Sequence, residues 1–357
     1  MTSMRALLLP LSYLFGVGVA LRNRFFDIGL LPTEHVDVPV ISVGNISAGG
    51  VGKTPFVEFL ARWFMQQGKK VAIVSRGYKR RGNGTLVVSN GLVQCAEAAL
   101  AGDEPAQLAA KLKGTVVIVD ERRARGANLA RNRFKVDVIL LDDGFQHRSL
   151  KRDLDLVLLP VDEVKKKHRL LPAGNYREST GALRRCDGVV LTRCESKEHF
   201  EQGLATVKTF TDKPVIGTAT RVSAVRRAQS HFSVDLNGLK GKKIVAFSGI
   251  GDPVSFKRTL HSLKWEVVRF LPYPDHHRYS DSDVETIKKA LKQAEGEYLV
   301  TTEKDVYRLS DAGGAARELI NHASLFFVEI EQAVLVGEEL LEGWLKRFLN
   351  RHASSLI

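Results

Sequence analysis

The sequence predicts an α/β fold, with a mostly parallel sheet covered by helices on both faces and a second, smaller α/β domain. Three observations predict it. An apolar run at 38–43 enters a glycine-rich turn that ends in Gly52-Lys53-Thr54, and an amphipathic helical pattern follows. Short, almost continuously apolar runs alternate with helical patterns, which is typical of a parallel sheet buried on both faces. At 357 residues the chain is long enough for two domains, each with its own core.

The glycine-rich turn predicts a phosphate-binding loop, and therefore a P-loop NTPase-like sheet. Glycines let backbone N–H groups approach a β-phosphate, Lys53 can reach the β and γ oxygens, and Thr54 can bind Mg²⁺. Ser47 stands where the strict pattern has glycine. The alternative is a tight turn with an incidental Lys-Thr pair. The residues predicted to bind ATP are Ser47, Ala48, Gly49, Gly50, Val51, Gly52, Lys53 and Thr54.

The remaining elements follow in two series. In the first, strands are expected at 71–75, 86–89, 115–120, 136–142, 154–159, 188–192 and 214–218. In the second, strands are expected at 243–247, 265–270, 298–301 and 326–330, and helices from 253, at 281–293 and at 338–349. The expected organisation is an N-terminal helix at 1–30, a nucleotide-binding domain at 31–218, a linker at 219–239 and a smaller domain at 240–357 that closes over the active site.

The composition narrows the classes of binding partner and indicates the redox state of the protein's compartment. The formal net charge of +13 indicates an acidic partner, either nucleic acid or an anionic membrane surface, unless the charge is only a solvated surface. The three cysteines, Cys95, Cys186 and Cys194, have no paired spacing, which argues against a disulfide framework or a zinc site. A reducing compartment fits this pattern best.

The N-terminal segment bears on the choice of partner. Residues 6–21 are almost entirely apolar and are flanked by Arg5, Arg22 and Arg24. This stretch is shorter than the roughly 20 residues that span a bilayer. It therefore predicts a helix that lies in the membrane interface, with a buried domain helix as the alternative.

Acidic residues mark two further sites. Asp142 and Asp143 end a buried strand, where a P-loop protein holds Mg²⁺, although such a pair also occurs in simple turns. Asp103 and Glu104 stand at a helix start, and spacing alone favours helix capping for them. In a functional interpretation, one acid faces the γ-phosphate and takes a proton from an acceptor hydroxyl. A histidine-rich segment at 275–279 is ambiguous by itself.

Taken in order, these blocks resemble the tetraacyldisaccharide 4′-kinase family, the lipid A 4′-kinases of Gram-negative bacteria. The matching segments cover roughly residues 1–310, and Ser47 belongs to this family's version of the loop. They are Val43-Gly44-Asn45 through Thr54-Pro55, Ser75-Arg76-Gly77-Tyr78, Gly102-Asp103-Glu104-Pro105, Asp142-Asp143-Gly144-Phe145-Gln146-His147, Leu170-Leu171-Pro172-Ala173-Gly174, Asp275-His276-His277 and Thr302-Glu303-Lys304-Asp305.

The resemblance implies transfer of the ATP γ-phosphate to the 4′-hydroxyl of a tetraacylated glucosamine disaccharide 1-phosphate. It implies that Asp103 is the catalytic base, assisted by His276, and that Lys53 is the catalytic lysine. The predicted ligands of Mg²⁺ are Thr54, Asp142, Asp143 and Glu104. The residues predicted to bind the disaccharide are Asn45, Arg76, Tyr78, Gln146, His147 and Arg123.

The resemblance also implies a monomer attached peripherally to an anionic membrane, on the cytoplasmic face of the bacterial inner membrane, with no nucleic-acid partner. One departure is a basic run at 165–169, where the family has a short Gly/Asn turn. The alternative from another class is a membrane-associated regulatory ATPase of the partition or septum-positioning type. Ala48 argues against it, because those proteins carry a lysine there that reaches the partner subunit's nucleotide. A nucleic-acid-binding ATPase would account for the charge, but no such module is recognisable.

Overall fold

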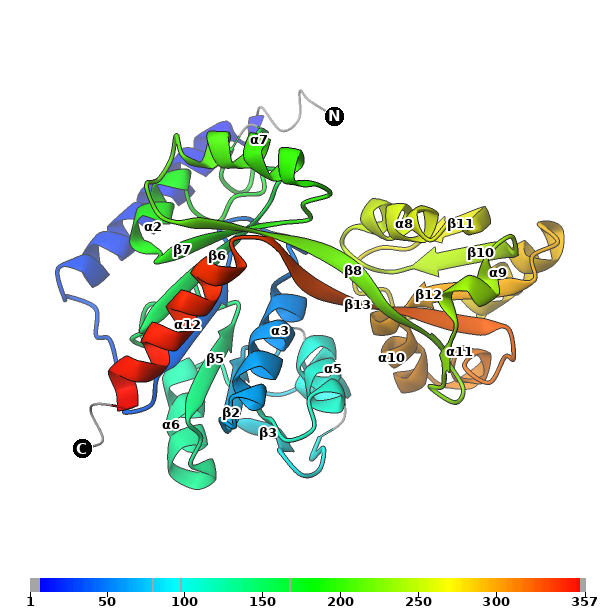
Figure 1. Cartoon of the computed structure of the whole chain (residues 1–357), viewed down its shortest axis with the longest axis horizontal. Coiled ribbons are helices and arrows are strands. Elements are labelled where there is room, and N and C mark those ends of the chain that lie inside the picture. The colour runs from blue at the N-terminus through cyan, green and yellow to red at the C-terminus, as the bar shows by residue number, and fades with distance from the viewer. Residues whose placement is uncertain (1–6, 79, 97, 167, 354–357) are drawn as a thin grey trace. The chain divides into compact units, whose positions relative to one another are not determined.

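The computed structural model describes residues 7–78, 80–96, 98–166 and 168–353. Arg5, Lys79 and Lys167, which belong to the basic N-terminal flank and to two basic runs, lie outside the described residues. The chain forms two compact units (Figure 1). Unit 1 contains the residues up to Thr220 and those from Gln332 onward, and unit 2 runs from Arg221 to Glu331.

Unit 1 is built on a mostly parallel sheet with the strand order β8-β7-β6-β1-β5-β2-β4-β3. β1 (Val40–Gly44) precedes the glycine-rich turn, pairs with β5 and β6, and places Val43 opposite Asp142. The other strands are β2 (Val71–Ser75), β3 (Leu86–Asn90), β4 (Val116–Val119), β5 (Val138–Asp142), β6 (Leu154–Pro160), β7 (Gly188–Thr192) and β8 (Val215–Arg227). Of these pairs, β3–β4 is antiparallel and the others are parallel.

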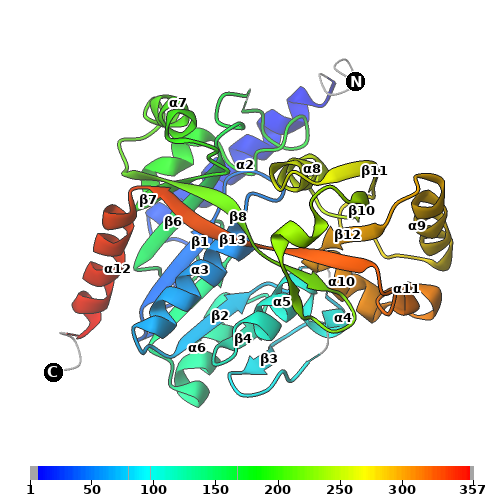
Figure 2. The same cartoon turned by 45° about the vertical axis from the view of Figure 1, so that its right-hand side comes forward.

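Helices cover both faces of this sheet, and its central strands are therefore buried along their whole length. α3 (Lys53–Gln66), α5 (Asp103–Lys111) and α12 (Glu338–Ala353) share one core, in which α3 and α12 lie side by side (Figure 2). α6 (Arg123–Phe134) and α7 (Lys197–Val207) pack against the opposite face. The predicted fold class is confirmed. Two short helical segments, α4 (Ala98–Ala101) and η1 (Thr180–Arg185), complete this part of unit 1.

The division of the chain differs from the expected one in two places. The stretch 219–239, expected to be a linker, contains the rest of β8, the short strand β9 (Ser233–Val234) and a 3-10 turn, η2 (Leu236–Leu239). Beyond Thr218 most of β8 is only partly buried, so its sequence carries little apolar alternation. The C-terminal α12, expected in the second domain, packs in unit 1 because its apolar side joins the core formed with α3.

Unit 2 has its strands in the order β11-β10-β12-β13. They are β10 (Lys243–Ser248), β11 (Glu266–Pro272), β12 (Tyr298–Thr302) and β13 (Leu325–Val336), which continues into unit 1. Its helices are α8 (Pro253–Ser262), α9 (Asp281–Gln293), α10 (Glu303–Asp311) and α11 (Gly314–Leu319). α9 has the predicted bounds. α10 was not expected; its N-cap is Thr302, whose hydroxyl accepts a hydrogen bond from the Asp305 N–H, so the Thr302–Asp305 block is a helix start.

The N-terminal helix α2 (Leu9–Asp27) has an unusual distribution of side chains. Ser12 is its one buried residue among those described, whereas Tyr13, Leu14 and Val17 are 74%, 69% and 58% exposed. α2 is therefore not a buried core helix. No helix among the described residues is long and apolar enough to cross a bilayer.

Candidate active site

The carboxyl ends of the parallel strands of unit 1 bring the predicted site segments to one edge of the sheet. β1 leads into the loop at 45–52, β5 into Asp143, and β2 into Arg76. β4 lies next to β2 and leads towards Arg123 at the start of α6. This edge is where open α/β sheets bind their ligands. The sequence placed these segments far apart, and the strand order makes them neighbours.

The phosphate-binding loop has the backbone that the glycine pattern predicts. Gly52 is the N-cap of α3 and has φ = 89°, a conformation that side chains with a Cβ rarely adopt. Lys53 and Thr54 therefore form the first turn of α3, where unpaired N–H groups favour an anion. A Cβ on Gly44 would lie 2.5 Å from the Phe145 Cβ, so glycine at the end of β1 allows the segment after β5 to pack closely.

A second segment, at 170–177, supports the loop from outside. The N–H of Ala48 donates to the carbonyl of Asn175 at 2.6 Å, and Arg177 Nε donates to the carbonyl of Ser47 at 3.1 Å. From β7, the Thr192 hydroxyl donates to the carbonyl of Val51 at 2.9 Å. These bonds tie the loop at both ends, while Ala48, Gly49 and Gly50 stay exposed.

Lys53, Asp143 and Arg177 form a charged cluster beside the loop. Lys53 Nζ lies 3.4 Å from Asp143 Oδ1 and 3.2 Å from Asn45 Oδ1. Arg177 donates to both oxygens of Asp143 at 3.0 Å and also to Asn45 Oδ1. Burial alone would raise the pKa of Asp143, but Lys53 and Arg177 outweigh it and hold that pKa at about 2. Asp143 is therefore ionised at neutral pH.

Thr54 and Asp142 supply oxygen atoms at the same edge. Both are almost fully buried, Thr54 in the first turn of α3 and Asp142 at the last position of β5. The parallel register sets Asp142 opposite Val43, directly before the loop. Hydroxyl and carboxylate oxygens are suitable donors for Mg²⁺, which binds few protein ligands and keeps phosphate and water oxygens.

A positive field surrounds His147. Burial, together with the smaller effects of Arg123, Arg152, Arg22 and Arg76, lowers the pKa of His147 to about 4, so its ring is neutral. Arg123 itself is 3% exposed, and burial lowers its pKa to about 10 in spite of the nearby Asp143. This concentration of arginines suits an anionic group of a ligand.

Asp103 and Glu104 stand in the first turn of α5, but neither is its N-cap. The N-cap is Gly102, which has no side chain with which to cap the helix. Asp103 therefore stands one position after the N-cap, in the first turn of α5. A Cβ added to Gly102 would lie 3.2 Å from the carbonyl oxygen of Tyr78, so the segment after β2 packs closely beside Gly102. Tyr78 is 63% exposed.

His276 lies in unit 2, in the segment after β11. It has φ = 61°, and its N–H donates to the carbonyl of Gly249 at 3.1 Å. Arg308 Nη1 donates to the same carbonyl, and Arg308 Nη2 lies 3.5 Å from His276 Nδ1. Asp305 accepts from the Gly249 N–H and from Arg308. The neighbouring His277 is engaged with Asp283 at 3.0 Å.

Sequence reasoning missed Arg177, Glu178 and Arg185. Arg177 pairs with Asp143, and Arg185 donates to both oxygens of Glu178 at 2.7 Å. Arg177 and Glu178 lie three and four residues after the Leu170–Gly174 block already singled out, and that proximity was the available signal. The pairing of Arg177 with Asp143, 34 residues apart, cannot be inferred from spacing, because it depends on how the 170–177 segment folds back on the loop.

Comparisons with known proteins agree with this geometry. Residues 4–350 match the family model for tetraacyldisaccharide-1-P 4′-kinase, LpxK. The tetraacyldisaccharide 4′-kinase of Aquifex aeolicus is 41% identical over 309 residues, which cover 86% of this chain and 90% of that protein. The one from Chlorobium phaeovibrioides is 35% identical over 350 residues, covering 97% and 98%. A crystal structure of LpxK from Aquifex aeolicus in complex with ATP has a TM-score of 0.77 and 36% identity, covering 98% of this chain and 99% of that one.

Proposed function

This chain belongs to the tetraacyldisaccharide 4′-kinase family, and from that membership we propose how its own residues carry out the reaction. It is an ATP-dependent kinase of lipid A biosynthesis that phosphorylates the 4′-hydroxyl of a tetraacylated glucosamine disaccharide 1-phosphate. The observation that carries the assignment is the phosphate-binding loop within a family match over nearly the whole chain. The partition-type ATPase alternative is not favoured, because relatives matched over that length are kinases.

The loop at 47–54 binds the phosphates of ATP. Backbone N–H groups of the loop and of the first turn of α3 face the β-phosphate, and Lys53 holds the β and γ oxygens. The 3.4 Å distance between Lys53 Nζ and Asp143 Oδ1 supports this role, because the carboxylate keeps the ammonium group beside the loop until a phosphate replaces the carboxylate as its partner. Arg177 remains bonded to Asp143 and prevents that carboxylate from being left unpaired.

Thr54 and Asp142 would hold Mg²⁺, and Asp143 and Glu104 are the other two carboxylates predicted to serve it. The donor set fits this ion, since the Thr54 hydroxyl and the Asp142 carboxylate offer hard oxygens. When bound, Mg²⁺ neutralises charge on the β- and γ-phosphates.

Asp103 acts as the general base, and His276 assists it from unit 2. Asp103 takes the proton of the 4′-hydroxyl as that oxygen bonds to the γ-phosphorus, and the bond from the γ-phosphorus to the bridging oxygen breaks to release ADP. Two observations support a chemical role for Asp103: it is not the N-cap residue of α5, and the preceding Gly102 packs beside the segment after β2. His276, bonded to Gly249, orients Asp103 or shares its proton when the second domain closes over the substrate.

The disaccharide binds along the arginine-rich part of the same edge. Arg76 and Arg123 attract its phosphate, and neutral His147 offers a hydrogen bond without adding charge. Tyr78 is exposed and can lie against a sugar ring. Gln146 and Asn45 are bonded to each other at 2.8 Å, through the Gln146 amide and the Asn45 carbonyl, and they form the floor of this part of the site.

α2 attaches the enzyme peripherally to the cytoplasmic face of the inner membrane. Two of its polar side chains bond to other parts of unit 1: Ser12 to the carbonyl of Leu170 at 3.0 Å, and Asn23 to Glu178 at 2.7 Å. Its apolar side chains are exposed instead, which is the reverse of a helix that belongs to a globular core. An exposed apolar face with basic residues at its end suits the interface of an anionic membrane.

The test is incubation of the purified protein with γ-labelled ATP, Mg²⁺ and the tetraacylated disaccharide 1-phosphate in detergent micelles. We expect a labelled 1,4′-bisphosphate, and no product when the metal is chelated. Release of free phosphate from ATP without labelling of the disaccharide would contradict the assignment. Full activity in the presence of the chelator would contradict the role of Thr54 and Asp142.

A further inference from the structure

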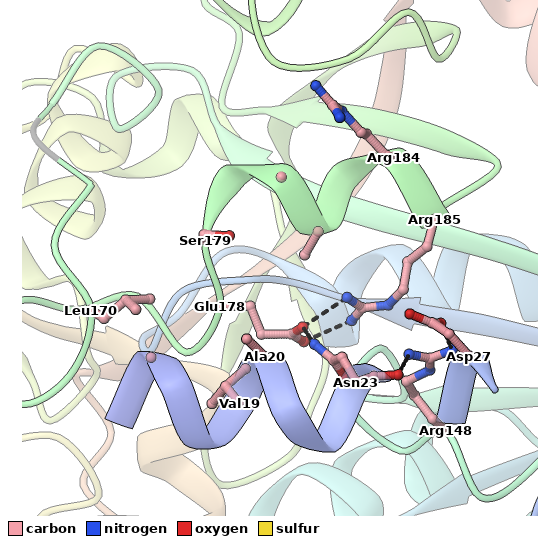
Figure 3. A pocket seen from close by; sticks show the side chains of 13 residues that line it. Val19, Ala20, Asn23, Asp27, Arg148, Leu170, Glu178, Ser179, Arg184 and Arg185 are labelled. Carbon is pink, nitrogen blue, oxygen red and sulfur yellow. Dashed lines mark hydrogen bonds and ion pairs between the residues drawn. The ribbon is translucent and has the colours of Figure 1, made fainter. Parts of the chain in front are cut away.

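Glu178 is a buried carboxylate at which three distant segments of unit 1 meet. It is 2% exposed and follows Arg177, directly before η1. Asn23 Nδ2 of α2 donates to its Oε2 at 2.7 Å, and the guanidinium of Arg185 donates to both of its oxygens at 2.7 Å (Figure 3). Gln146 Nε2, from the segment after β5, donates to Oε1 at 2.9 Å. The carboxylate thus accepts four hydrogen bonds, and truncating it would leave several buried donors unpaired.

The bonds of Glu178 continue to the catalytic lysine. The same Gln146 amide nitrogen donates to the backbone carbonyl of Asn45 at 2.8 Å, and the Asn45 side chain accepts from Lys53 Nζ at 3.2 Å. Asn45 is fully buried at the end of β1, where its amide nitrogen also donates to the Ser47 carbonyl at 2.6 Å. An unbroken path of short contacts therefore leads from α2 to Lys53.

α2 also touches the Gln146 segment directly. Arg22 Nη2 donates to the carbonyl of Gln146 at 2.8 Å, and Arg148 Nη1 donates to the carbonyl of Asn23 at 2.9 Å. Figure 3 shows Arg148 beside Asn23 at the end of α2, with Arg148 paired to Asp27. Because these contacts are concentrated around Asn23, a shift of α2 on unit 1 cannot leave the Gln146 segment undisturbed.

We propose that Glu178 is a positioning residue that couples the seating of α2 to the placement of Lys53, through Gln146 and Asn45. The inference rests on the proposed role of Lys53 in phosphoryl transfer. α2 is the helix with the exposed apolar face. A membrane or micelle that binds this face would therefore also keep the hydrogen-bonded path from Glu178 to Lys53 in position. A displacement of about 1 Å at a catalytic group can cost up to ~10²-fold in rate, which makes such a support worthwhile.

The test uses three variants of the full chain, Asn23→Ala, Glu178→Gln and the double variant, with Asp27→Asn as the control. Asn23→Ala removes one bond between α2 and Glu178, whereas the amide of Glu178→Gln presents a donor where Arg185 and Asn23 already donate. Asp27→Asn removes an ion pair between the end of α2 and Arg148 without touching Glu178. The measurements are kcat and KM for the disaccharide in micelles, the Kd of ATP, and thermal unfolding.

We expect Asn23→Ala and Glu178→Gln each to lower kcat by about tenfold or more, with smaller changes in the KM of the disaccharide. The double variant should be no slower than Glu178→Gln, because both act through one path. Asp27→Asn should keep the wild-type kcat.

Three results would overturn the proposal: an unchanged kcat with only a lower melting temperature, a change confined to the KM of the disaccharide, or multiplicative losses in the double variant. Should Glu178→Gln not fold, Asn23→Ala and Asp27→Asn decide the matter, since each removes one contact of a partly exposed or exposed side chain. Failure of the proposed function is distinguishable, because it would appear as normal turnover by Lys53→Ala, whatever the Asn23 variant does.

Discussion

Each unit contains an aspartate paired with an arginine, and the two pairs differ in exposure. In unit 1 the Asp143 and Arg177 side chains are 38% and 26% exposed, with a contact of 3.0 Å. In unit 2 the Asp305 and Arg308 side chains are 0% and 5% exposed, with a contact of 3.2 Å. The first pair stands beside the phosphate-binding loop and also involves Lys53. The second bonds to the N–H and the carbonyl of Gly249, the residue that holds His276.

The difference shows how the same ion pair serves two purposes. A partly exposed pair adds little stability, because water competes for both charges, but its charges remain within reach of a ligand's phosphates. A fully buried pair is costly to form and more costly to break, so it keeps a loop in one conformation. In the proposed mechanism, unit 1 therefore uses its pair for binding and chemistry, whereas the pair in unit 2 holds the segment that carries His276.

The largest effect on turnover is expected at Lys53, the third charge of the exposed cluster. Lys53→Ala should lower kcat by about 10³-fold or more, because the β and γ oxygens lose their point charge. Its melting temperature should stay near that of the wild type, since Lys53 is not part of the core. Lys288→Ala, which removes an exposed lysine from α9, is the matched control for the change in net charge. Substantial turnover by folded Lys53→Ala would remove the loop from the mechanism.

The next effect tests the proposed pairing of Asp103 with His276. Asp103→Ala should lower kcat by about 10²-fold or more while leaving the Kd of ATP nearly unchanged, because a sugar hydroxyl needs a base at neutral pH. His276→Ala should act in the same direction by a smaller factor. The double variant should be much less impaired than the product of the two losses. Kinetic measurement of all three decides the matter, and strictly multiplicative losses would mean that the residues act separately.

Replacing the two arginines tests the comparison itself. Arg308→Ala should lower the free energy of unfolding by about 3–5 kcal/mol, because it leaves Asp305 buried without its cation. Arg177→Ala should lower it by less than ~1 kcal/mol, since the pair is partly exposed, yet reduce kcat more than a stability loss explains. Denaturant unfolding and kcat per folded molecule measure the two. Equal losses of stability would show that exposure does not separate the pairs.

The smallest effect on turnover is expected from the exposed face of α2, where neither ion pair is touched. The double substitution Leu14→Glu with Val17→Glu should reduce binding to vesicles of anionic lipid severalfold, because two charges then face the apolar interface. Its kcat on substrate dispersed in detergent should be nearly unchanged. Leu92→Glu, at a leucine after β3 that is even more exposed, is the control. Identical vesicle binding by both variants would mean that α2 does not contact the membrane.

The α/β class, the strands of the first domain and the phosphate-binding loop could be predicted from local patterns in the sequence. The loop could be predicted because Gly52, Lys53 and Thr54 are consecutive, so that glycine conformation and helix dipole act within a few residues. The position of Asp142 and Asp143 at the edge of the sheet could be predicted because a buried strand ends there. The second half of β8 could not, since a partly buried strand has no clear alternation.

What the tertiary structure alone decided is which distant charges meet. Asp103 looked like a helix cap until the structure showed Gly102 in that position. Arg177 reaches Asp143 across 34 residues, and Glu178 reaches Asn23 across 155. Sequence specifies backbone conformation through forces between near neighbours, whereas these pairings depend on strand order and on loops folding back over the sheet edge. The chemistry of the loop was therefore determined by the sequence, and its link to the N-terminal helix was decided by the fold.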